Sequence, residues 1–221
     1  MKQTLLFSLS LIILLSSCTS QKSVQSSAEV TKTFTESQSK LIHKDGIKTP
    51  MRILQITDYK DSIILRTKSQ PIDLSSQKET TKTLANRLLT TVNDPKNPGV
   101  GIAAPQVGIL KQMIAVQRFD KKGNPFEIYI NPVIKQYSVK TQFCLEGCLS
   151  IPDKMDTTKN RAYAILLEYD KMDGSHTYEM IEAFTAVIFQ HEIDHLNGIL
   201  FTDHLDIEIE EAEERKRKEN E

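Results

Sequence analysis

The stretch QHEIDHLNG, residues 190–198, carries the most information about fold and chemistry in this sequence. Its two histidines, His191 and His195, are four residues apart, so on a helix both imidazoles face one side and can bind the same divalent metal ion. Glu192 directly follows the first histidine and is placed to reach a water on that ion. The pattern therefore predicts a helix that carries the metal site of a hydrolase.

Residues on both sides of this stretch support the helix. The positions that fall at helical spacing on one stripe are Phe184, Val187, Ile188 and His191. Gly198 follows where a C-terminal cap is expected, because glycine readily adopts the left-handed conformation that ends many helices. The alternative is a chance amphipathic helix with two surface histidines, and the rest of the sequence argues against it.

A catalytic metal held by two histidines needs a third protein ligand if one coordination position is to stay open for water. A third histidine, as in the metzincin pattern, is disfavoured because Phe201 occupies its position. A glutamate from a later helix, as in thermolysin, has five candidates: Glu208, Glu210, Glu211, Glu213 and Glu214. Cysteine is the remaining source, and Cys148 lies in the glycine-containing stretch EGCLS, residues 146–150.

The tail glutamates have a simpler explanation than metal binding. They stand four residues before basic residues in the pairs Glu211–Arg215, Glu213–Arg217 and Glu214–Lys218. Pairs in this order stabilise an exposed helix by a few tenths of a kcal/mol each. We therefore expect a charged C-terminal helix over residues 207–221.

Three stretches occur in order along the chain: GVGIAAPQ at residues 99–106, EGCLS at 146–150 and QHEIDHL at 190–196. They resemble the three signature motifs of peptide deformylase, in the same order. The resemblance runs from about Met51 to about Leu205. It implies an α+β fold, with mixed or antiparallel strands around a central metal-binding helix. It also implies hydrolysis of the N-formyl group of formyl-methionyl peptides, with release of formate.

The resemblance assigns roles to particular residues. The metal ligands would be Cys148, His191 and His195. Glu192 would be the general acid/base, while the Gln106 side-chain amide and the Leu149 backbone N–H would hold the oxyanion. The family commonly uses Fe²⁺, with Zn²⁺ able to substitute, and a Cys/His/His site does not discriminate between the two ions.

Substrate contacts are implied in the same way. The peptide would lie extended against the backbone of Val100, Gly101 and Gly147. The methionine side chain would enter an apolar pocket formed by Phe184, Val187 and Ile188. These three positions are equally compatible with ordinary core residues, because the same stripe must hold the helix against the protein.

Glu146 and Arg161 match a family pair that would brace the turn bearing Cys148. Two positions depart from the family. Asp153-Lys154-Met155 follows Ile-Pro where many members carry an arginine near the substrate, which bears on peptide affinity. Ala183 stands where a glycine often precedes the metal helix, which is a milder change.

The N-terminus resembles a bacterial lipoprotein signal. A short apolar run follows Lys2 and leads to Leu15-Ser16-Ser17-Cys18, in which Cys18 is the predicted lipidation site. The run is shorter than the ~20 residues that span a bilayer, so we expect residues 1–17 to be removed. An uncleaved hydrophobic anchor would give nearly the same membrane attachment. Because residue 19 is Thr and not Asp, we expect an exported lipoprotein in the outer membrane, facing the periplasm.

Residues 18–49 are rich in Ser, Thr, Gln and Lys, which predicts a flexible tether. Residues 50–206 then form a single catalytic domain in this chain of 221 residues. Loss of Lys2 with the signal lowers the basic residues from 28 to 27 against 29 acidic ones, a net charge of −2. This balance shows no basic surplus for a nucleic-acid partner.

Local patterns outline the remaining elements. Ser76 and Glu79 have the spacing of a capping box, which predicts a helix that ends near Asp94-Pro95. Alternating apolar residues predict strands over residues 112–118, 127–134, 162–170 and 176–181. Cys144 reads as a buried apolar residue, and a disulfide between it and Cys148 is not expected because it would consume the metal thiolate.

Two other functions remain open on the sequence alone. A thermolysin-like protease would use the same histidines with a tail glutamate and would not need Cys148. A lipid-anchored binding protein on a deformylase fold would keep the architecture without catalysis.

Overall fold

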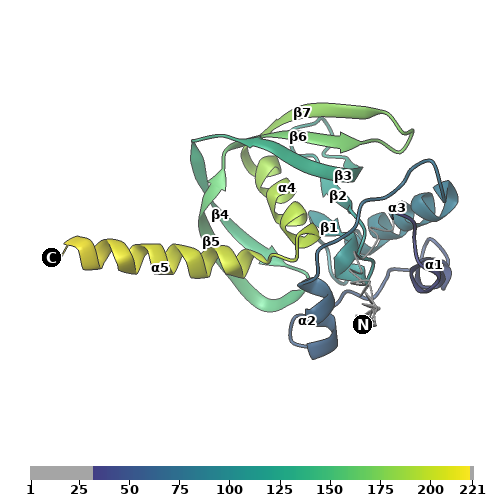
Figure 1. Ribbon diagram of the computed structural model, residues 1–221, viewed down its shortest axis with the longest axis horizontal. Coiled ribbons are helices and arrows are strands. Elements are labelled where there is room, and N and C mark those ends of the chain that lie inside the picture. The colour runs from purple at the N-terminus through teal and green to yellow at the C-terminus, as the bar shows by residue number, and fades with distance from the viewer. Residues whose placement is uncertain (1–31, 220–221) are drawn as a thin grey trace, which may run out of the picture.

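Helix α4 (Ala183–Leu196) lies between the two sheets of an α+β fold (Figure 1). The computed structural model describes residues 32–219. The other helices are α1 (Glu36–His43), α2 (Tyr59–Leu65), α3 (Lys78–Val92) and α5 (Phe201–Glu219), with a 3-10 turn η1 (Ala104–Val107). Helix α4 contacts strands of both sheets, so the fold is assembled around the predicted metal helix.

The larger sheet has the strand order β1-β2-β3-β6-β7, with every neighbouring pair antiparallel. Its strands are β1 (Gly101–Ala103), β2 (Met113–Gln117), β3 (Phe126–Tyr137), β6 (Ala164–Asp170) and β7 (His176–Glu182). A second, two-stranded sheet pairs β4 (Thr141–Cys148) with β5 (Ile151–Ala162). The four strands predicted from alternation are confirmed, and β3 is longer at its C-terminal end than expected.

Alternation along β6 explains how the larger sheet holds α4. Ile165, Leu167 and Tyr169 are buried, whereas the residues between them are partly exposed. The buried side chains belong to the same cluster as Phe189 and Ile193 of α4. Full burial of a large apolar side chain contributes about 1.5–3 kcal/mol. This packing fixes the rotation of α4 and therefore the direction in which its histidines point.

Helix α1 contradicts the prediction that residues 18–49 form a flexible tether throughout. Thr35 caps the helix: its Oγ1 accepts from Gln38 N–H (3.2 Å), and the Gln38 side chain accepts from Thr35 N–H (3.0 Å). Ile42 is fully buried in the cluster that α1 shares with α3. The segment was misread because its polar composition hides a few well-spaced apolar residues.

The predicted signal (residues 1–17), the lipidation site Cys18 and the tether up to residue 31 lie outside the described residues. Within residues 32–219, no helix combines the length and the apolar content needed to cross a bilayer.

The start of α3 also differs from expectation. The capping box predicted at Ser76 and Glu79 is wrong, because the N-cap is Gln77 in the left-handed conformation (φ 53°), without a side-chain cap. The Gln77 side chain accepts instead from Phe34 N–H (2.6 Å), which ties the segment before α1 to α3. The helix ends at Val92, as predicted from the Asp-Pro signal.

Helix α5 begins at Phe201, earlier than the predicted 207, and projects away from the rest of the molecule (Figure 1). Phe201 and Leu205 bury its first turns. Beyond them the helix is largely exposed, and the expected pair between Glu214 and Lys218 forms (2.7 Å). The Glu208 carboxylate accepts from Lys159 N–H and Asn160 N–H (2.7 and 3.0 Å) on β5.

Candidate metal centre and active site

Helix α4 places His191 and His195 on one face, with ring centroids 5.1 Å apart. Both side chains are buried or nearly so. The helix stops within one turn of His195 because Gly198 adopts φ 75°, and a Cβ there would lie 2.5 Å from the carbonyl oxygen of Arg66. Only glycine fits this position, which confirms the predicted C-terminal cap.

Cys148 reaches the histidines from the end of β4. The β4–β5 register shifts between Gly147 and Cys148, so the thiol turns out of the regular ladder. Its Sγ lies 3.2 Å from His195 Nε2, and the ligand atoms of Cys148, His191 and His195 all lie within 4.8 Å of one another. Burial by itself raises the pKa of the Cys148 thiol, but the charges of His195 and His191 outweigh it and hold that pKa well below its usual range.

Glu146 fixes the orientation of His191. His191 Nδ1 donates to Glu146 Oε2 (2.8 Å), which leaves the other ring nitrogen free to bind a metal. Arg161 donates to both oxygens of the same carboxylate (2.8 and 3.0 Å), and Thr158 Oγ1 donates to one of them. Burial opposes ionisation, but these bonds lower the pKa of Glu146 to about 2. The predicted contact between Glu146 and Arg161 is therefore formed.

The Arg161 brace extends further than the sequence suggested. Its Nη1 donates to Asp194 Oδ2 (2.6 Å), and Asp194 also pairs with His204 of α5 (2.8 Å). Asp194 lies between the two histidines in sequence, and this position could have indicated a structural role. His204 carries no such signal, because it lies outside the three motifs and outside every predicted helix and strand.

Glu192 lies beside the ligand group and is buried. Burial raises its pKa to about 7, with the neighbouring histidines opposing the shift. Its Oε2 has no hydrogen-bond partner among the described residues. Gly101 makes room for this carboxylate, since a Cβ at Gly101 would lie 2.4 Å from Glu192 Oε1. Gly101 therefore has a role besides the predicted contact with the peptide backbone, because only a residue without a Cβ leaves space for the Glu192 carboxylate.

Gln106 is held in η1 with its amide directed at the ligand group. Its Oε1 accepts from Ala103 N–H (2.8 Å), so Nε2 is free to donate towards Ser150 Oγ (3.3 Å) and Cys148 Sγ (3.6 Å). Leu149 is fixed from the other side, because Gln55 Nε2 donates to its carbonyl (3.0 Å). The sequence gave no signal for Gln55, which lies outside the three motifs.

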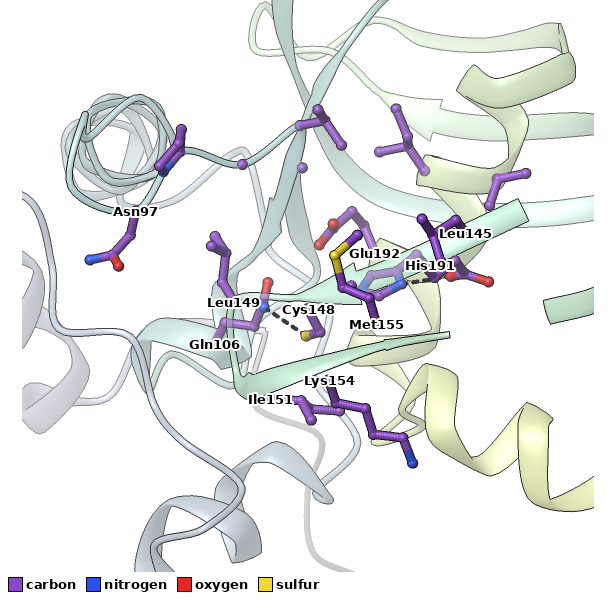
Figure 2. Close-up of a pocket in the computed structure, with 18 of the residues that line it drawn as sticks. Asn97, Gln106, Leu145, Cys148, Leu149, Ile151, Lys154, Met155, His191 and Glu192 are labelled. Atoms are coloured by element: carbon purple, nitrogen blue, oxygen red, sulfur yellow. Dashed lines mark hydrogen bonds and ion pairs between the residues drawn. The ribbon is translucent and has the colours of Figure 1, made fainter. Parts of the chain in front are cut away.

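One cavity of about 850 Å³ is lined by Gln106, Cys148 and Leu149 together with His191 and Glu192 (Figure 2). The cavity wall includes all six predicted substrate contacts: Val100, Gly101, Gly147, Phe184, Val187 and Ile188. Val187 and Ile188 are buried, while Phe184 is exposed at the rim and packs against Phe119 with ring centroids 5.3 Å apart. The structure therefore brings the predicted substrate residues together around two of the candidate metal ligands, Cys148 and His191.

Cys144 is half-buried and lines the same cavity, so the prediction of a buried apolar residue is wrong. It shares one face of β4 with Glu146 and Cys148, which also line the cavity. Burial raises the pKa of its thiol. Cys144 and Cys148 are both free thiols, as expected.

One thiol and two imidazoles within reach of a single point form a donor set that suits a divalent transition metal. Beside them, the buried carboxylate of Glu192 has one oxygen without a partner among the described residues, and such a group can accept a proton. The tail glutamates lie on the projecting helix α5, and Glu208 is engaged with β5. The fold and site thus define a hydrolase with a Cys/His/His metal centre.

Comparison with known proteins identifies the family. The sequence model of polypeptide deformylase matches residues 53–210. Peptide deformylase 2 of Bacillus cereus is 34% identical over 157 residues, which cover 66% of this chain and 85% of the relative. A peptide deformylase of Desulforudis audaxviator is 36% identical over 153 residues, covering 69% of this chain and 94% of the relative.

Solved structures agree with the sequence relatives. A class I type b peptide deformylase from Acinetobacter baumannii gives a TM-score of 0.63 at 30% identity, covering 71% of this chain and 99% of the other. Peptide deformylase from Thermotoga maritima gives 0.59 at 31% identity, covering 70% and 97%. The chain belongs to the peptide deformylase family. It is a hydrolase that uses a divalent metal ion to remove the N-formyl group from peptides.

Proposed function

We propose that Cys148, His191 and His195 bind the catalytic ion and that Glu192 moves the protons of formyl hydrolysis. Glu192 carries this proposal: it is a buried carboxylate beside the ligand group, and its Oε2 has no partner among the described residues. With a pKa of about 7, the Glu192 carboxyl is available both protonated and ionised near neutral pH. A group that must first accept a proton and then donate it needs this property.

We propose Fe²⁺ as the native ion, with Zn²⁺ able to replace it, since a thiolate and two imidazoles accept both. When bound, such an ion polarises the formyl carbonyl and lowers the pKa of a water from about 15.7 towards 7. Metal analysis of protein purified without oxygen tests the choice. Zinc without iron in the fully active protein would contradict it.

Glu192 takes a proton from the attacking water as the water oxygen bonds to the formyl carbon. It returns the proton to the amide nitrogen as the bond between that nitrogen and the formyl carbon breaks. The two steps give formic acid and a free N-terminal amine, so the single proton carried by Glu192 balances them. The acid then loses its remaining proton and leaves as formate.

Gln106 and Leu149 would stabilise the carbonyl oxygen as it becomes negative. The Gln106 amide donates without adding a charge, and its bond to Ala103 fixes its direction before substrate arrives. The Leu149 N–H is the second donor, on a residue whose carbonyl is held by Gln55. One donor held in place in this way is typically worth about 3 kcal/mol of barrier.

We propose that the peptide lies extended along Val100, Gly101 and Gly147, with its methionine side chain among Phe184, Val187 and Ile188. The cavity supports this arrangement because it contains both groups of residues. One Acinetobacter baumannii relative has been solved with Met-Ala-Ser bound, at a TM-score of 0.61 and 29% identity. That ligand supports a peptide substrate that begins with methionine.

Formate release from formyl-Met-Ala-Ser tests the proposal. Glu192→Gln should lower kcat by about 10²–10⁴-fold while metal content stays unchanged. Cys148→Ala should lose the metal, and Glu210→Gln, on the exposed part of α5, should match the natural chain. Unchanged formate release by Glu192→Gln would refute the assigned role. Cleavage of casein that persists in Cys148→Ala would indicate a protease instead.

We also propose that the chain is an exported lipoprotein anchored through Cys18 to the outer membrane, where it acts on formyl peptides outside the cytoplasm. The apolar run that ends in Leu15-Ser16-Ser17-Cys18 supports this location. Cell fractionation and metabolic labelling with palmitate test it. Cys18→Ala should abolish labelling and lower the membrane-bound share, and an unlabelled natural chain would contradict the proposal.

A further inference from the structure

A row of exposed apolar side chains lies on the β4–β5 hairpin, beside the catalytic cavity. Phe143 is 76% exposed, Leu145 60% and Met155 66%. Single exposed apolar residues are common on protein surfaces and need no explanation. These three are different because they adjoin one another and lead away from the cavity.

The strand geometry places the row on one face. Residues of β4 alternate between outward and inward positions, and Phe143, Leu145 and Gly147 share the outward face. Met155 of β5 lies directly across from Gly147. Its side chain covers that glycine closely, since a Cβ at Gly147 would lie 3.2 Å from Met155 Cγ. The apolar face therefore continues from Met155, over Gly147, to Leu145 and Phe143.

This face is continuous with the reaction site. Leu145, Gly147 and Met155 line the cavity together with His191 and Glu192 (Figure 2). Phe143 does not line it and extends the row outside. When the formyl group of a peptide lies beside Glu192, the following residues of the peptide extend out of the cavity. The row is an apolar surface that these residues can contact, because it begins at the cavity wall.

The backbone of β4 offers a way to hold such a chain. Within residues 32–219, β4 pairs with β5 on one side and with no strand on the other. An unpaired strand edge can accept an extended peptide as an added strand, with side chains alternating between its two faces. Strands rise about 3.3 Å per residue, so Leu145 lies about 7 Å and Phe143 about 13 Å beyond Gly147. These lengths correspond to the second to fifth residues of a bound peptide.

We propose that the outward face of the β4–β5 hairpin binds the downstream part of the substrate and selects formyl peptides whose second to fifth residues are apolar. The inference rests on the proposed deformylase function. Polar residues at these positions leave Phe143 and Leu145 exposed to water, whereas apolar residues cover them and bind more tightly.

Two peptides test the proposal on the natural chain: formyl-Met-Leu-Leu-Phe-Leu-Lys-Lys and formyl-Met-Ser-Ser-Asn-Ser-Lys-Lys. The shared lysines keep both in solution. Partial burial of two or three apolar side chains should favour the first peptide by about tenfold in kcat/KM, mostly through KM. Phe143→Ser should reduce the ratio of kcat/KM between the two peptides to about threefold or less, and Phe143→Leu should retain most of this preference.

Matched variants separate this role from a general loss of structure. Phe143→Ser should hydrolyse formyl-Met-Ala at the natural rate, because Phe143 lies outside the cavity. Met180→Ser removes an apolar side chain of β7 that is 58% exposed, and it should leave the ratio of kcat/KM between the two peptides unchanged.

Several outcomes overturn the inference. Equal kcat/KM for the two peptides, or a preference that Phe143→Ser does not reduce, overturns it while leaving the deformylase function intact. A dimer that Phe143→Ser dissociates in sedimentation would mean that a second copy covers this face. Absence of formate from every peptide would instead be a failure of the proposed function.

Discussion

Replacement of Gly101 by alanine should inactivate the enzyme while leaving the three proposed metal ligands in place. A Cβ at Gly101 would lie 2.4 Å from Glu192 Oε1 and 2.9 Å from both Cδ and Cγ. Ordinary contacts with a methyl group begin near 3.4 Å, so the carboxylate must move by about 1 Å. Glu192 is buried and cannot move without displacing its neighbours.

A misplacement of that size at the reacting centre typically costs about 10²-fold in rate. We therefore expect Gly101→Ala to lower kcat on formyl-Met-Ala-Ser by about two orders of magnitude. Overpacking should also cost about 1–3 kcal/mol in the free energy of unfolding. Metal content should stay unchanged, because the three atoms nearest to the added Cβ all belong to Glu192, which is not a proposed ligand.

The assay combines steady-state kinetics, metal analysis and urea denaturation. Gly46→Ala is the matched control, because a Cβ there meets nothing within 4 Å. Adding Gly101→Ala to Glu192→Gln should cause little further loss if the alanine acts through Glu192. A Gly101→Ala enzyme whose kcat stays within threefold of the natural value would refute the reasoning, as would full additivity of the two changes.

Three further predictions follow from the structure. Ala183→Gly should raise the free energy of unfolding by about 1 kcal/mol, because Ala183 adopts φ 55°, which glycine tolerates better; an unchanged or lower melting temperature would contradict this. The Asp61 carboxylate accepts two hydrogen bonds from Arg52 (2.7 and 2.6 Å), and these bonds lower the pKa of Asp61 below 3.8. The ionised carboxylate therefore stabilises the fold at neutral pH, and this contribution is lost as the pH falls through the lowered pKa. Asp61→Asn should therefore be less stable than the natural chain at pH 7, and the difference should shrink in acid, as urea denaturation would show. A difference independent of pH would argue against this role of Asp61. Removal of the metal by a chelator should abolish formate release and lower the melting temperature, and addition of Fe²⁺ should restore both. A melting temperature that the chelator does not change would mean that the ion does not stabilise the fold.

Much of the site could be predicted because its residues lie in short motifs with local rules. The spacing of His191 and His195 needs only the geometry of one helix, and Gly198 needs only the left-handed conformation that ends it. The contact between Cys148 and His195 joins positions 47 residues apart, and no local rule predicts it. The resemblance of three motifs to a family supplied that contact.

The features that escaped prediction depend on tertiary packing. Gln55 braces Leu149 from a segment 94 residues away, without any local pattern. The predicted capping box of α3 is wrong in a region where Gln77 accepts a hydrogen bond from Phe34 N–H. Phe34 belongs to residues 18–49, for which the composition predicts a tether. The exposure of Cys144 could not be predicted from the sequence. Alternation along β4 shows which residues share a face, but it does not show which of them line the cavity.

The charged chain from Glu146 through Arg161 and Asp194 to His204 joins β4, β5, α4 and α5. Protein side chains alone thus fix the imidazole of His191, through the bond from its Nδ1 to Glu146. Because the four members of this chain come from four different elements, a substitution in α5, such as His204→Ala, can change the angle of a ring that lies in α4.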